Sequence, residues 1–483
     1  MHLYDTKAKS VVPIVPARAG ALSIYACGPT VYRDAHVGNM RTFLLPDLIR
    51  RAAEAEGLQL RLVQNITDVG HMADDTGLGA NEGAADSLGS IDEGQGDGED
   101  KVLAQAAREG RGALAVARAY EDAFHRDLAL LNIYPADEYP RASESIPLMI
   151  DLISTLIASG HAYVGGDGSV FFDARSFPQY GELSGNKLDQ LRPGHRFDGG
   201  VDDSKRFHAD WALWKKAGPT RTQLVWDTPW GAGFPGWHTE CSAMSLSLLG
   251  DTIDIHTGGI DLRFPHHEDE RAQSNCATGT EVVRHWVHGE HLLFEGRKMS
   301  KSTGNVVLVS DVIARGFDPL ALRLAFMSNR YRQQLNLTWE SITAADTTIR
   351  RWRERVAQWA TGPSAALSPE HLDAMKAAFA DDLDTPRAIT VLRELEKDSS
   401  VSDGTKLETF LAADRLLGLD LARDIGKAPV VVELSDEAAE LLERRRIARA
   451  EKQWALSDQL RDELAALGLI VTDTSDGQVI ATS

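Results

Sequence analysis

The sequence contains little that would suit a secreted or membrane protein. It has three cysteines in 483 residues, no basic-then-apolar segment at its N-terminus, and no apolar stretch approaching the length of a membrane span. We therefore expect no disulfides, no secretory leader and no membrane partner, and a reducing cytoplasm fits the chain. No internal repeat is visible. The remaining composition, 43% hydrophobic and 25% charged, is ordinary for a globular protein of roughly two to four domains.

Basic residues are also fewer than acidic ones. The chain has 51 lysines and arginines against 71 aspartates and glutamates, which gives a net charge of −20. A nucleic-acid partner would therefore have to dock on local basic patches, and two predicted helices carry such runs. The runs are Arg350, Arg351, Arg353 and Arg355, and then Arg444, Arg445, Arg446, Arg449 and Lys452, close to Trp454. Each run could equally be a solvated helix face paired with nearby glutamates.

One segment, from about residue 70 to 98, has neither lysine nor arginine but many glycines and acidic residues. Such a composition cannot bury enough apolar surface to order itself, so we expect a mobile loop. His71, Asp74 and Asp75 could in principle bind a metal there. A solvated acidic loop is the favoured interpretation.

What the sequence does contain is a short loop suited to a polyphosphate. Residues 298–302 read KMSKS within a Gly-Arg-KMSKS-x-Gly-Asn run, so Lys298, Lys301 and two serine hydroxyls share one loop. Ammonium groups stabilise the negative charge that builds on a departing pyrophosphate, and hydroxyls and loop amides donate further hydrogen bonds. The alternative is a solvated basic turn, but this string is rarely met by chance.

A second phosphate-binding pattern lies near the N-terminus. The apolar alternating segment Ala21 to Ala26 predicts a strand, which runs into a CGPTVY turn and then into HVGN at residues 36–39, the start of a helix through roughly Ala55. The free amides of that helix start favour an anion, Gly38 allows close approach, and His36 can donate to a phosphate oxygen. Alone the tetrapeptide is a weak signal. Together with KMSKS it becomes a strong one.

Two of the cysteines suggest a metal site. His266 and Glu270 are four residues apart after a proline helix start, so they face one side of a helix. With Cys27 and Cys241 they make two thiolates, an imidazole and a carboxylate, a plausible set for Zn²⁺. On spacing alone, two buried cysteines and a surface His/Glu pair are an equal alternative. The third cysteine, Cys276, is most simply a core residue.

The two signature motifs together resemble those of class I aminoacyl-tRNA synthetases. The strings CGPTVY, GWHTECSAM and TGGIDLRFPHHEDE resemble, in the same order, the motifs of the cysteinyl-tRNA synthetase family. The resemblance covers nearly the whole chain, including NITD at 65–68, the Trp211–Trp214 region and the run 448–477. Two departures stand out. Asn39 replaces the last histidine of the HIGH tetrapeptide and can donate a hydrogen bond but carries no charge, and the acidic loop is inserted before Glu99.

The resemblance also implies roles for individual residues. It implies one zinc ion per chain, held by Cys27, Cys241, His266 and Glu270. It implies a catalytic ATP site formed by His36, Asn39, Lys298 and Lys301, completed by Gly38, Gly258, Gly259 and Asp261. A cysteine pocket is implied at Thr67 and Trp237. The implied substrates are Mg²⁺-ATP, L-cysteine and tRNA(Cys), and the implied protein is a cytoplasmic monomer.

The implied fold is α/β. Residues 1–310 are expected to form a Rossmann-like class I synthetase catalytic domain, interrupted by a connective insertion at about 110–225 that contains strands at 161–164 and 169–173. A stem-contact segment (311–341), an α-helical domain that binds the anticodon stem (342–428) and a small C-terminal α/β anticodon-recognition domain (429–483) follow. The last domain is expected to hold two helices and a β element over 469–479.

The activity implied is a two-step acyl transfer. The cysteine carboxylate attacks the α-phosphorus of ATP, and the 2′-hydroxyl of the terminal tRNA adenosine then attacks the cysteinyl-adenylate. Zinc would select the substrate thiolate, because the hydroxyl of serine is a harder and poorer ligand. A cysteine:amino-sugar ligase on the same core and a non-catalytic paralogue that binds tRNA or amino acid are the alternatives. The C-terminal segment argues against the first, and the intact motifs argue against the second.

Overall fold

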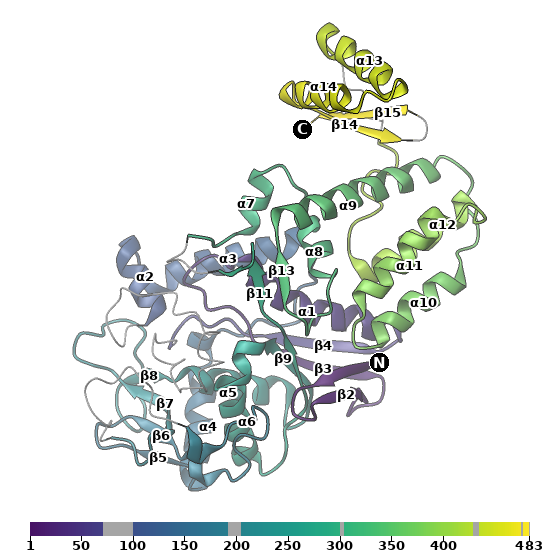
Figure 1. The fold of residues 1–483 in the computed structure, drawn as a ribbon. Coiled ribbons are helices and arrows are strands. Elements are labelled where there is room, and N and C mark those ends of the chain that lie inside the picture. Colours follow the sequence, from purple (N-terminus) through teal and green to yellow (C-terminus); the bar gives the residue numbers. More distant parts are fainter. Residues whose placement is uncertain (71–99, 192–203, 300–303, 428–433, 475–476, 483) are drawn as a thin grey trace. The chain divides into compact units, whose positions relative to one another are not determined.

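The structure is a computed structural model. It describes residues 1–70, 100–191, 204–299, 304–427, 434–474 and 477–482. The chain divides into two compact units, Met1–Arg423 and Asp424–Ser483, and each is considered by itself (Figure 1). Apart from Gly70, the predicted acidic loop lies outside the described residues. Lys301 lies outside them too, with its neighbours Ser300, Ser302 and Thr303.

A four-stranded parallel sheet forms the centre of the first unit. Its order is β10 (Val283–Gly289), β9 (Ile253–Gly259), β3 (Ala21–Ala26) and β4 (Gln59–Gln64). Every residue of β9 is buried, as expected for an inner parallel strand whose two faces are both covered. The helix α1 (Val37–Ala55) lies on one side of the sheet, and α5 (Trp237–Leu249) with α6 (His266–Thr278) lies on the other (Figure 1). The predicted α/β class, the first strand and the first helix are confirmed.

A long insertion separates β4 from β9. Its described residues form α2 (Lys101–Glu109), α3 (Ala113–Leu130), α4 (Ile146–Ala158) and the short 3-10 helices η2 (Ala142–Glu144), η3 (Ala174–Ser176) and η4 (Leu188–Gln190). Its antiparallel sheet runs β5 (Ala162–Val164), β6 (Val170–Phe172), β7 (Trp211–Lys216) and β8 (Gly233–Pro235). The two predicted short strands are confirmed. The sheet extends past residue 225, the predicted end of the insertion, because β8 pairs with β7. The Gly-Phe-Pro sequence of β8 has no alternating pattern, so this strand could not be predicted from the sequence.

The remainder of the first unit holds a second small sheet and a group of helices. Strands β12 (Arg297–Lys298), β11 (Leu292–Phe294) and β13 (Leu335–Leu337) form a three-stranded sheet, and β1 (His2–Asp5) pairs with β2 (Ser10–Pro13). The helices are α7 (Val309–Ala314), α8 (Leu320–Phe326), α9 (Trp339–Trp359), α10 (Pro369–Ala380), α11 (Thr385–Lys397) and α12 (Asp403–Leu417). A proline at the start of α10 and another at the start of α11 fit the first helical turn, where the backbone N–H has no partner to lose.

The second unit is a small α/β element. It comprises α13 (Asp436–Ala450), α14 (Trp454–Ala466) and an antiparallel pair, β14 (Leu469–Thr474) and β15 (Gly477–Thr482). Leucines from both helices and alanines from α13 form its core with Leu469 and Val471 of β14. The two helices and the terminal β element predicted after residue 430 are confirmed.

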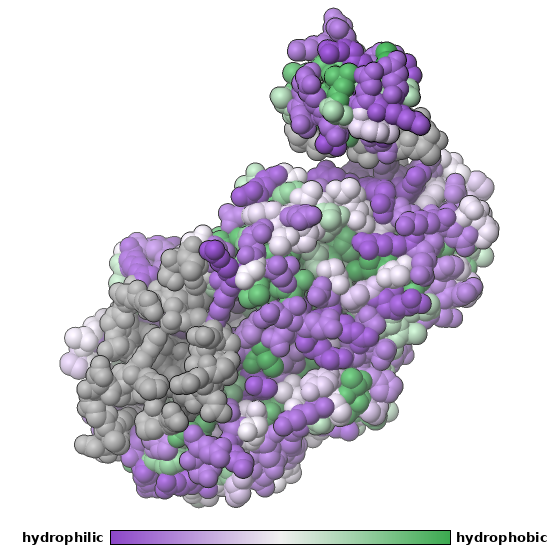
Figure 2. Space-filling view, viewed as in Figure 1, coloured by the Kyte–Doolittle hydropathy of each residue, from purple (hydrophilic) through white to green (hydrophobic). Residues whose placement is uncertain are grey.

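In the described ranges, no helix combines the length and apolar character needed to cross a bilayer. The face seen in Figure 2 is covered mainly by hydrophilic residues, and the hydrophobic ones are gathered in small, separate areas.

One carboxylate holds together the two ends that border the acidic insertion. The Gly70 N–H donates to Oδ2 of Asp100 over 3.0 Å, and Arg221 donates to the same oxygen over 2.9 Å. The other oxygen of Asp100 caps α2 by accepting from the backbone N–H groups of Val102 and Leu103. Gly70 and Asp100 are therefore held next to each other.

A second buried carboxylate, Asp47 of α1, ties distant segments to the central sheet. Its Oδ2 accepts from Arg51 (2.9 Å) and from Arg323 of α8 (2.6 Å), and its Oδ1 accepts from the Tyr134 backbone N–H. Arg323, fully buried, also donates to the carbonyls of Leu131, Asn132 and Leu417. Burial alone would raise the pKa of Asp47, but the two arginines outweigh it and lower the pKa.

Replacing Asp47 by asparagine should destabilise the first unit strongly. The change leaves two buried guanidinium groups without their negative partner, a loss of about 3–5 kcal/mol, which urea unfolding followed by tryptophan fluorescence will measure. The carboxylate stabilises above its unfolded pKa of 3.8, and this stability is lost as the pH falls through the lower folded value. Arg350→Ala is the control, because Arg350 is 60% exposed in its pair with Asp346 and its loss should cost less than about 1 kcal/mol. Equal losses in the two variants would contradict this account.

Candidate functional site

Four side chains predicted as metal ligands meet at the carboxyl edge of the parallel sheet. Cys27 directly follows β3, Cys241 lies in α5, and His266 and Glu270 lie one turn apart at the start of α6. All four are buried, and one ligand atom from each lies within 4.8 Å of the others. The structure thus brings the complete predicted set together.

The donor atoms of this cluster fit a metal ion. His266 Nε2 lies 2.9 Å from Glu270 Oε1, and Cys27 Sγ lies 3.8 Å from the same oxygen. A tetrahedral ion with ligand bonds of about 2.0–2.3 Å would bring its ligand atoms within about 4 Å of one another. The cluster could therefore close around one ion with small side-chain movements.

The electrostatics of the cluster also favour a cation. Burial would raise the pKa of Glu270, but His256 and His266 outweigh it and lower the pKa to about 2. Burial likewise opposes ionisation of Cys241, yet its hydrogen bond with Cys27 and the nearby His266 lower its pKa to about 6. Glu270 and Cys241 in turn raise the pKa of His266 to about 10 against the effect of burial. A proton on His266 thus balances negative charge in a place where a metal ion could do the same.

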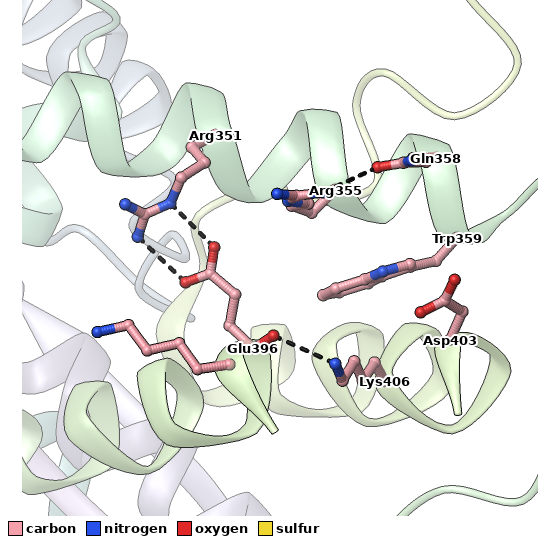
Figure 3. A pocket seen from close by; sticks show the side chains of 8 residues that line it. Arg351, Arg355, Gln358, Trp359, Glu396, Asp403 and Lys406 are labelled. Carbon is pink, nitrogen blue, oxygen red and sulfur yellow. Dashed lines mark hydrogen bonds and ion pairs between the residues drawn. The ribbon is translucent and has the colours of Figure 1, made fainter. Parts of the chain in front are cut away.

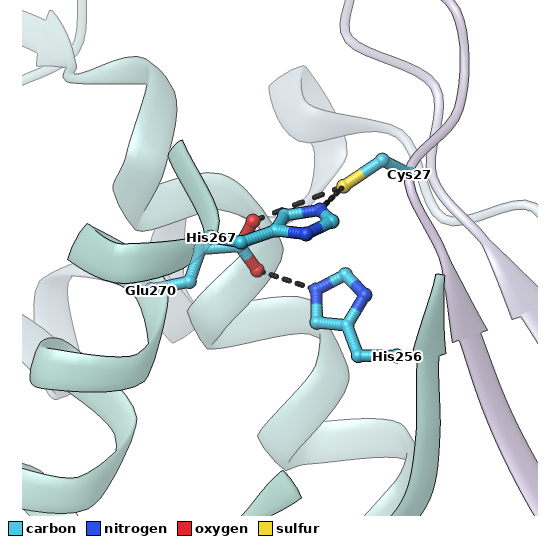
Figure 4. Close-up of side chains that lie close together, drawn as sticks. All are labelled: Cys27, His256, His267 and Glu270. Atoms are coloured by element: carbon cyan, nitrogen blue, oxygen red, sulfur yellow. Dashed lines mark hydrogen bonds and ion pairs between the residues drawn. The ribbon is translucent and has the colours of Figure 1, made fainter. Parts of the chain in front are cut away.

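Two further histidines hold the ligands and were not predicted from the sequence. His256 Nε2 lies 2.8 Å from Glu270 Oε2, and His267 Nε2 lies 3.2 Å from Cys27 Sγ (Figure 4). With those two ligands they form a second group whose ligand atoms lie within 4.8 Å of one another. The other nitrogen of His267 contacts His288, 2.8 Å away. A histidine in the fully buried strand β9 is a signal that could have drawn attention to His256.

The residues predicted for a cysteine pocket border this cluster. Thr67, which is buried, donates from Oγ1 to Glu240 Oε2 over 3.0 Å, and Glu240 immediately precedes Cys241. Trp237, the first residue of α5, stacks on His266 with ring centres 4.1 Å apart. Glu240 was not predicted either. Burial and the nearby Cys241 raise its pKa well above the usual range.

The HVGN motif forms the start of α1. His36 is the N-cap: its Nδ1 accepts from the Asn39 backbone N–H over 3.2 Å, and Asn39 Oδ1 accepts from the His36 N–H over 3.3 Å. This reciprocal capping box gives Asn39 a structural reason to replace histidine. Because Nδ1 accepts, the proton of the neutral ring is on Nε2. Burial and the positive charge of Arg33 lower the pKa of His36 to about 4, so the ring donates a hydrogen bond without carrying charge.

The two signature motifs lie in contact. A side-chain Cβ on Gly38 would come within 2.9 Å of Met299 Cε, so the glycine makes room for the buried methionine of KMSKS. The Val37 N–H donates to the Val307 carbonyl over 2.9 Å, and Asn305 Nδ2 donates to the Lys298 carbonyl over 2.9 Å. Residues on both sides of 300–303 are therefore anchored at the start of α1.

The glycines predicted for the nucleotide site end β9. A Cβ on Gly259 would lie 2.2 Å from Asp261 Oδ1, and a Cβ on Gly258 would lie 3.0 Å from the His267 ring. Close packing therefore favours glycine at 258, whereas at 259 a side chain would first have to displace the exposed carboxylate of Asp261. Asp261, in the 3-10 helix η5 (Ile260–Arg263), is exposed at the end of the strand.

One arginine from each of the two predicted basic runs is buried and paired within the protein. Arg353 is buried, paired with Asp318, and donates to the carbonyls of Leu419 and Asp420. Arg445 is buried as well and makes two hydrogen bonds of 2.8 Å to Asp473. These two arginines therefore stabilise their own units.

Other residues of the first basic run face a pocket. Its volume is about 360 Å³, and it lies between α9 and the helices α11 and α12 (Figure 3). Arg351 pairs with Glu396 over 2.9 Å, and Arg355 donates to Gln358. Four cationic and two acidic side chains line the pocket: Arg351, Arg355, Lys397 and Lys406 against Glu396 and Asp403. The local excess of positive charge contrasts with the negative charge of the whole chain.

Comparison with known families agrees with these features. A family model described as the class I (C) tRNA synthetase catalytic domain matches residues 13–76 and 94–347. A second model, described as the cysteinyl-tRNA ligase anticodon binding domain, matches residues 431–480. The break in the first match falls within the acidic insertion.

Individual relatives match over nearly the full length. The chain is 41% identical to a cysteine–tRNA ligase of Thermus thermophilus and 36% identical to that of Treponema denticola, with 98% of each chain covered in both cases. Among solved structures it is similar to Mycobacterium tuberculosis methionyl-tRNA synthetase in complex with methionyl-adenylate (TM-score 0.53, 15% identity, 90% of this chain and 96% of that one). It is also similar to a LeuRS–tRNA–LeuAMS complex from Agrobacterium radiobacter (TM-score 0.56, 10% identity, 84% of each chain). The structural likenesses establish a shared fold.

The His36 ring should stay neutral through the physiological pH range, with its proton on Nε2. Nitrogen-15 NMR of labelled histidine should report that tautomer at neutral pH and protonation only near pH 4. Arg33→Gln should raise this pKa, because it removes the neighbouring positive charge. Titration of wild-type His36 near its ordinary value of 6.5 would contradict the assignment.

Proposed function

The chain belongs to the cysteine–tRNA ligase family of class I aminoacyl-tRNA synthetases, and from this premise we propose that it activates L-cysteine with Mg²⁺-ATP and transfers it to tRNA(Cys). The observation that carries the proposal is the position of the thiol-rich cluster. Cys27 directly follows β3, and the chain then runs to His36 and α1, so the cluster lies beside the nucleotide motif. Cysteine-dependent exchange of labelled pyrophosphate into ATP, followed by charging of tRNA(Cys), tests it. Absence of exchange would contradict it.

In the first step the cysteine carboxylate attacks the α-phosphorus of ATP and pyrophosphate leaves. His36 donates its Nε2 proton to a phosphate oxygen as a hydrogen bond, and Asn39 holds the ring in that tautomer. Lys298 and Lys301 stabilise the charge that develops on the departing pyrophosphate. Gly38, Gly258 and Gly259 keep the site open to the nucleotide, and Asp261 faces the adenylate.

Selection of cysteine rests on the buried cluster. The donor set of Cys27, Cys241, His266 and Glu270 fits zinc, and a zinc ion held there would bind a substrate thiolate far better than the hydroxyl of serine. His256 and His267 keep Glu270 and Cys27 oriented toward it. Thr67 and Trp237 border the space that the substrate side chain would occupy.

In the second step the 2′-hydroxyl of the terminal adenosine of the tRNA attacks the activated carbonyl and AMP leaves. We assign contact with the acceptor stem to residues 311–341, contact with the anticodon stem to 342–428 and reading of the anticodon to 429–483. The match of residues 431–480 to an anticodon binding domain supports the last assignment. The net positive pocket of α9, α11 and α12 supports the second.

The same groups support a cytoplasmic monomer. Cys27 and Cys241 must stay reduced to bind a metal, and all three cysteines are free thiols.

Cys241→Ser should lower the zinc content and cysteine-dependent pyrophosphate exchange together, because a serine hydroxyl stays protonated and binds zinc poorly. Metal analysis and exchange kinetics on the same preparations measure both quantities. Cys276→Ser is the matched control, since Cys276 is outside the cluster and should keep both. Full activity in a metal-free Cys241→Ala protein would contradict the assignment of Cys241 as a zinc ligand.

Truncation after Lys427 should separate activation from transfer. All residues assigned to activation lie before position 303, so pyrophosphate exchange should remain nearly intact while charging of tRNA(Cys) falls. Phosphate contacts from the exposed part of the run 444–452 weaken steeply with ionic strength, so the truncation should reduce the salt dependence of tRNA binding.

Single substitutions refine this test. Arg444→Gln changes an exposed side chain and should weaken tRNA binding only, whereas Arg445→Gln removes the buried partner of Asp473 and should destabilise the second unit. If the truncated protein charged tRNA as well as the full chain, the tail would have no part in transfer. Transfer of cysteine to an amino sugar would then be assayed directly.

A further inference from the structure

One buried arginine joins the two halves of the nucleotide site. Arg41 lies on α1, within two turns of His36, and is 7% exposed. Its Nη1 donates to the carbonyls of Glu290 (2.8 Å) and His291 (3.0 Å). Its Nη2 donates to those of Arg330 (3.2 Å) and Gln333 (2.6 Å). Among the described residues, no carboxylate forms an ion pair with it.

The four carbonyls lie in the segments just before two neighbouring strands. Glu290 and His291 immediately precede β11, and Arg330 and Gln333 precede β13, its parallel partner. The third strand of that sheet, β12, pairs with β11 through Leu293 and Lys298. The guanidinium of Arg41 therefore fastens the sheet that carries Lys298 to the helix that carries His36 and Asn39.

The opposite end of this arrangement is also fixed. Val37 N–H bonds to the Val307 carbonyl, and Met299 packs against Gly38. The chain next to Lys298 is therefore attached to α1 at two places about one helical turn apart, at Gly38 through Met299 and at Arg41 through the carbonyls before β11 and β13. The separation between the lysine and the histidine is then set by rigid elements.

The chemistry of Arg41 is unusual for a purely stabilising residue. A buried cation without an ion pair is costly, and burial lowers the pKa of Arg41 to about 10 although the nearby charge of Glu290 opposes this shift. Its planar fork, however, holds two pairs of carbonyls in fixed directions, which a lysine or an apolar side chain cannot do.

We propose that Arg41 is a positioning residue for adenylate formation, which fixes Lys298 relative to His36 and Asn39. This inference rests on the function proposed above. It assigns no contact between Arg41 and any substrate.

Arg41→Lys tests the inference in the full-length protein, with Arg51→Lys as the matched control. Arg51 is on the same helix and is also buried, but it donates to Asp47 and to the carbonyls of Asn132 and Arg415. Arg41→Lys should lower kcat/KM for ATP in pyrophosphate exchange by about 10²-fold, the scale of a 1 Å misplacement. Its zinc content and KM for cysteine should be unchanged. Arg51→Lys should lower the melting temperature but should not selectively lower kcat/KM for ATP.

A double-mutant cycle distinguishes positioning from general stability. If Arg41 acts through Lys298, then Arg41→Lys should cost little further activity in a Lys298→Ala background. Equal costs in the two backgrounds would overturn the proposal, as would a loss of cysteine affinity equal to that of ATP. Inactivity of the wild-type protein would instead count against the proposed function.

A second variant covers the case in which Arg41→Lys does not fold. Arg41→Gln removes the charge but can still donate to two carbonyls, and it is taken through the same cycle at low temperature. Failure of both variants to fold would assign Arg41 to stability alone and overturn the proposal.

Discussion

The cost of burying charge governs how this protein is arranged. The cluster of thiol, imidazole and carboxylate groups is removed from water, and each group is stable there only because another member hydrogen-bonds to it or neutralises it. Cys27 comes from a strand end, Cys241 from α5, and His266 and Glu270 from α6, so the three elements must meet at the carboxyl edge of the sheet. The nucleotide motif starts from the same edge, and the cluster therefore sets the geometry of the whole site.

The same constraint explains how the chain uses its arginines. Arg41, Arg323 and Arg353 are buried and donate to backbone carbonyls of segments distant in sequence. A guanidinium suits this role because its five donors can satisfy several carbonyls at once. Arginines used in this way are unavailable to RNA phosphates, so a count of basic residues along α9 or α13 overstates the nucleic-acid surface.

The sequence predicted those parts of the site that depend on local pattern. The strand before Cys27, the helix after His36 and the i, i+4 pair on α6 follow from periodicity, capping and helix geometry, and the metal set followed from family resemblance. It did not predict His256, Glu240 or Arg41, because their partners are brought close only by tertiary packing. The burial of Arg353 and Arg445 escaped prediction for the same reason: a helix face exposed in isolation is covered by another element of the same unit.

The hydrogen bond between Gly70 and Asp100 affects how readily residues can be inserted or deleted between them during evolution. Because Asp100 also caps α2 and binds Arg221, one carboxylate fixes both ends of the intervening segment. The entropy of closing such a segment grows only with the logarithm of its length. Residues can therefore be gained or lost between Gly70 and Asp100 at little cost to the stability of the catalytic core, so this position tolerates insertions.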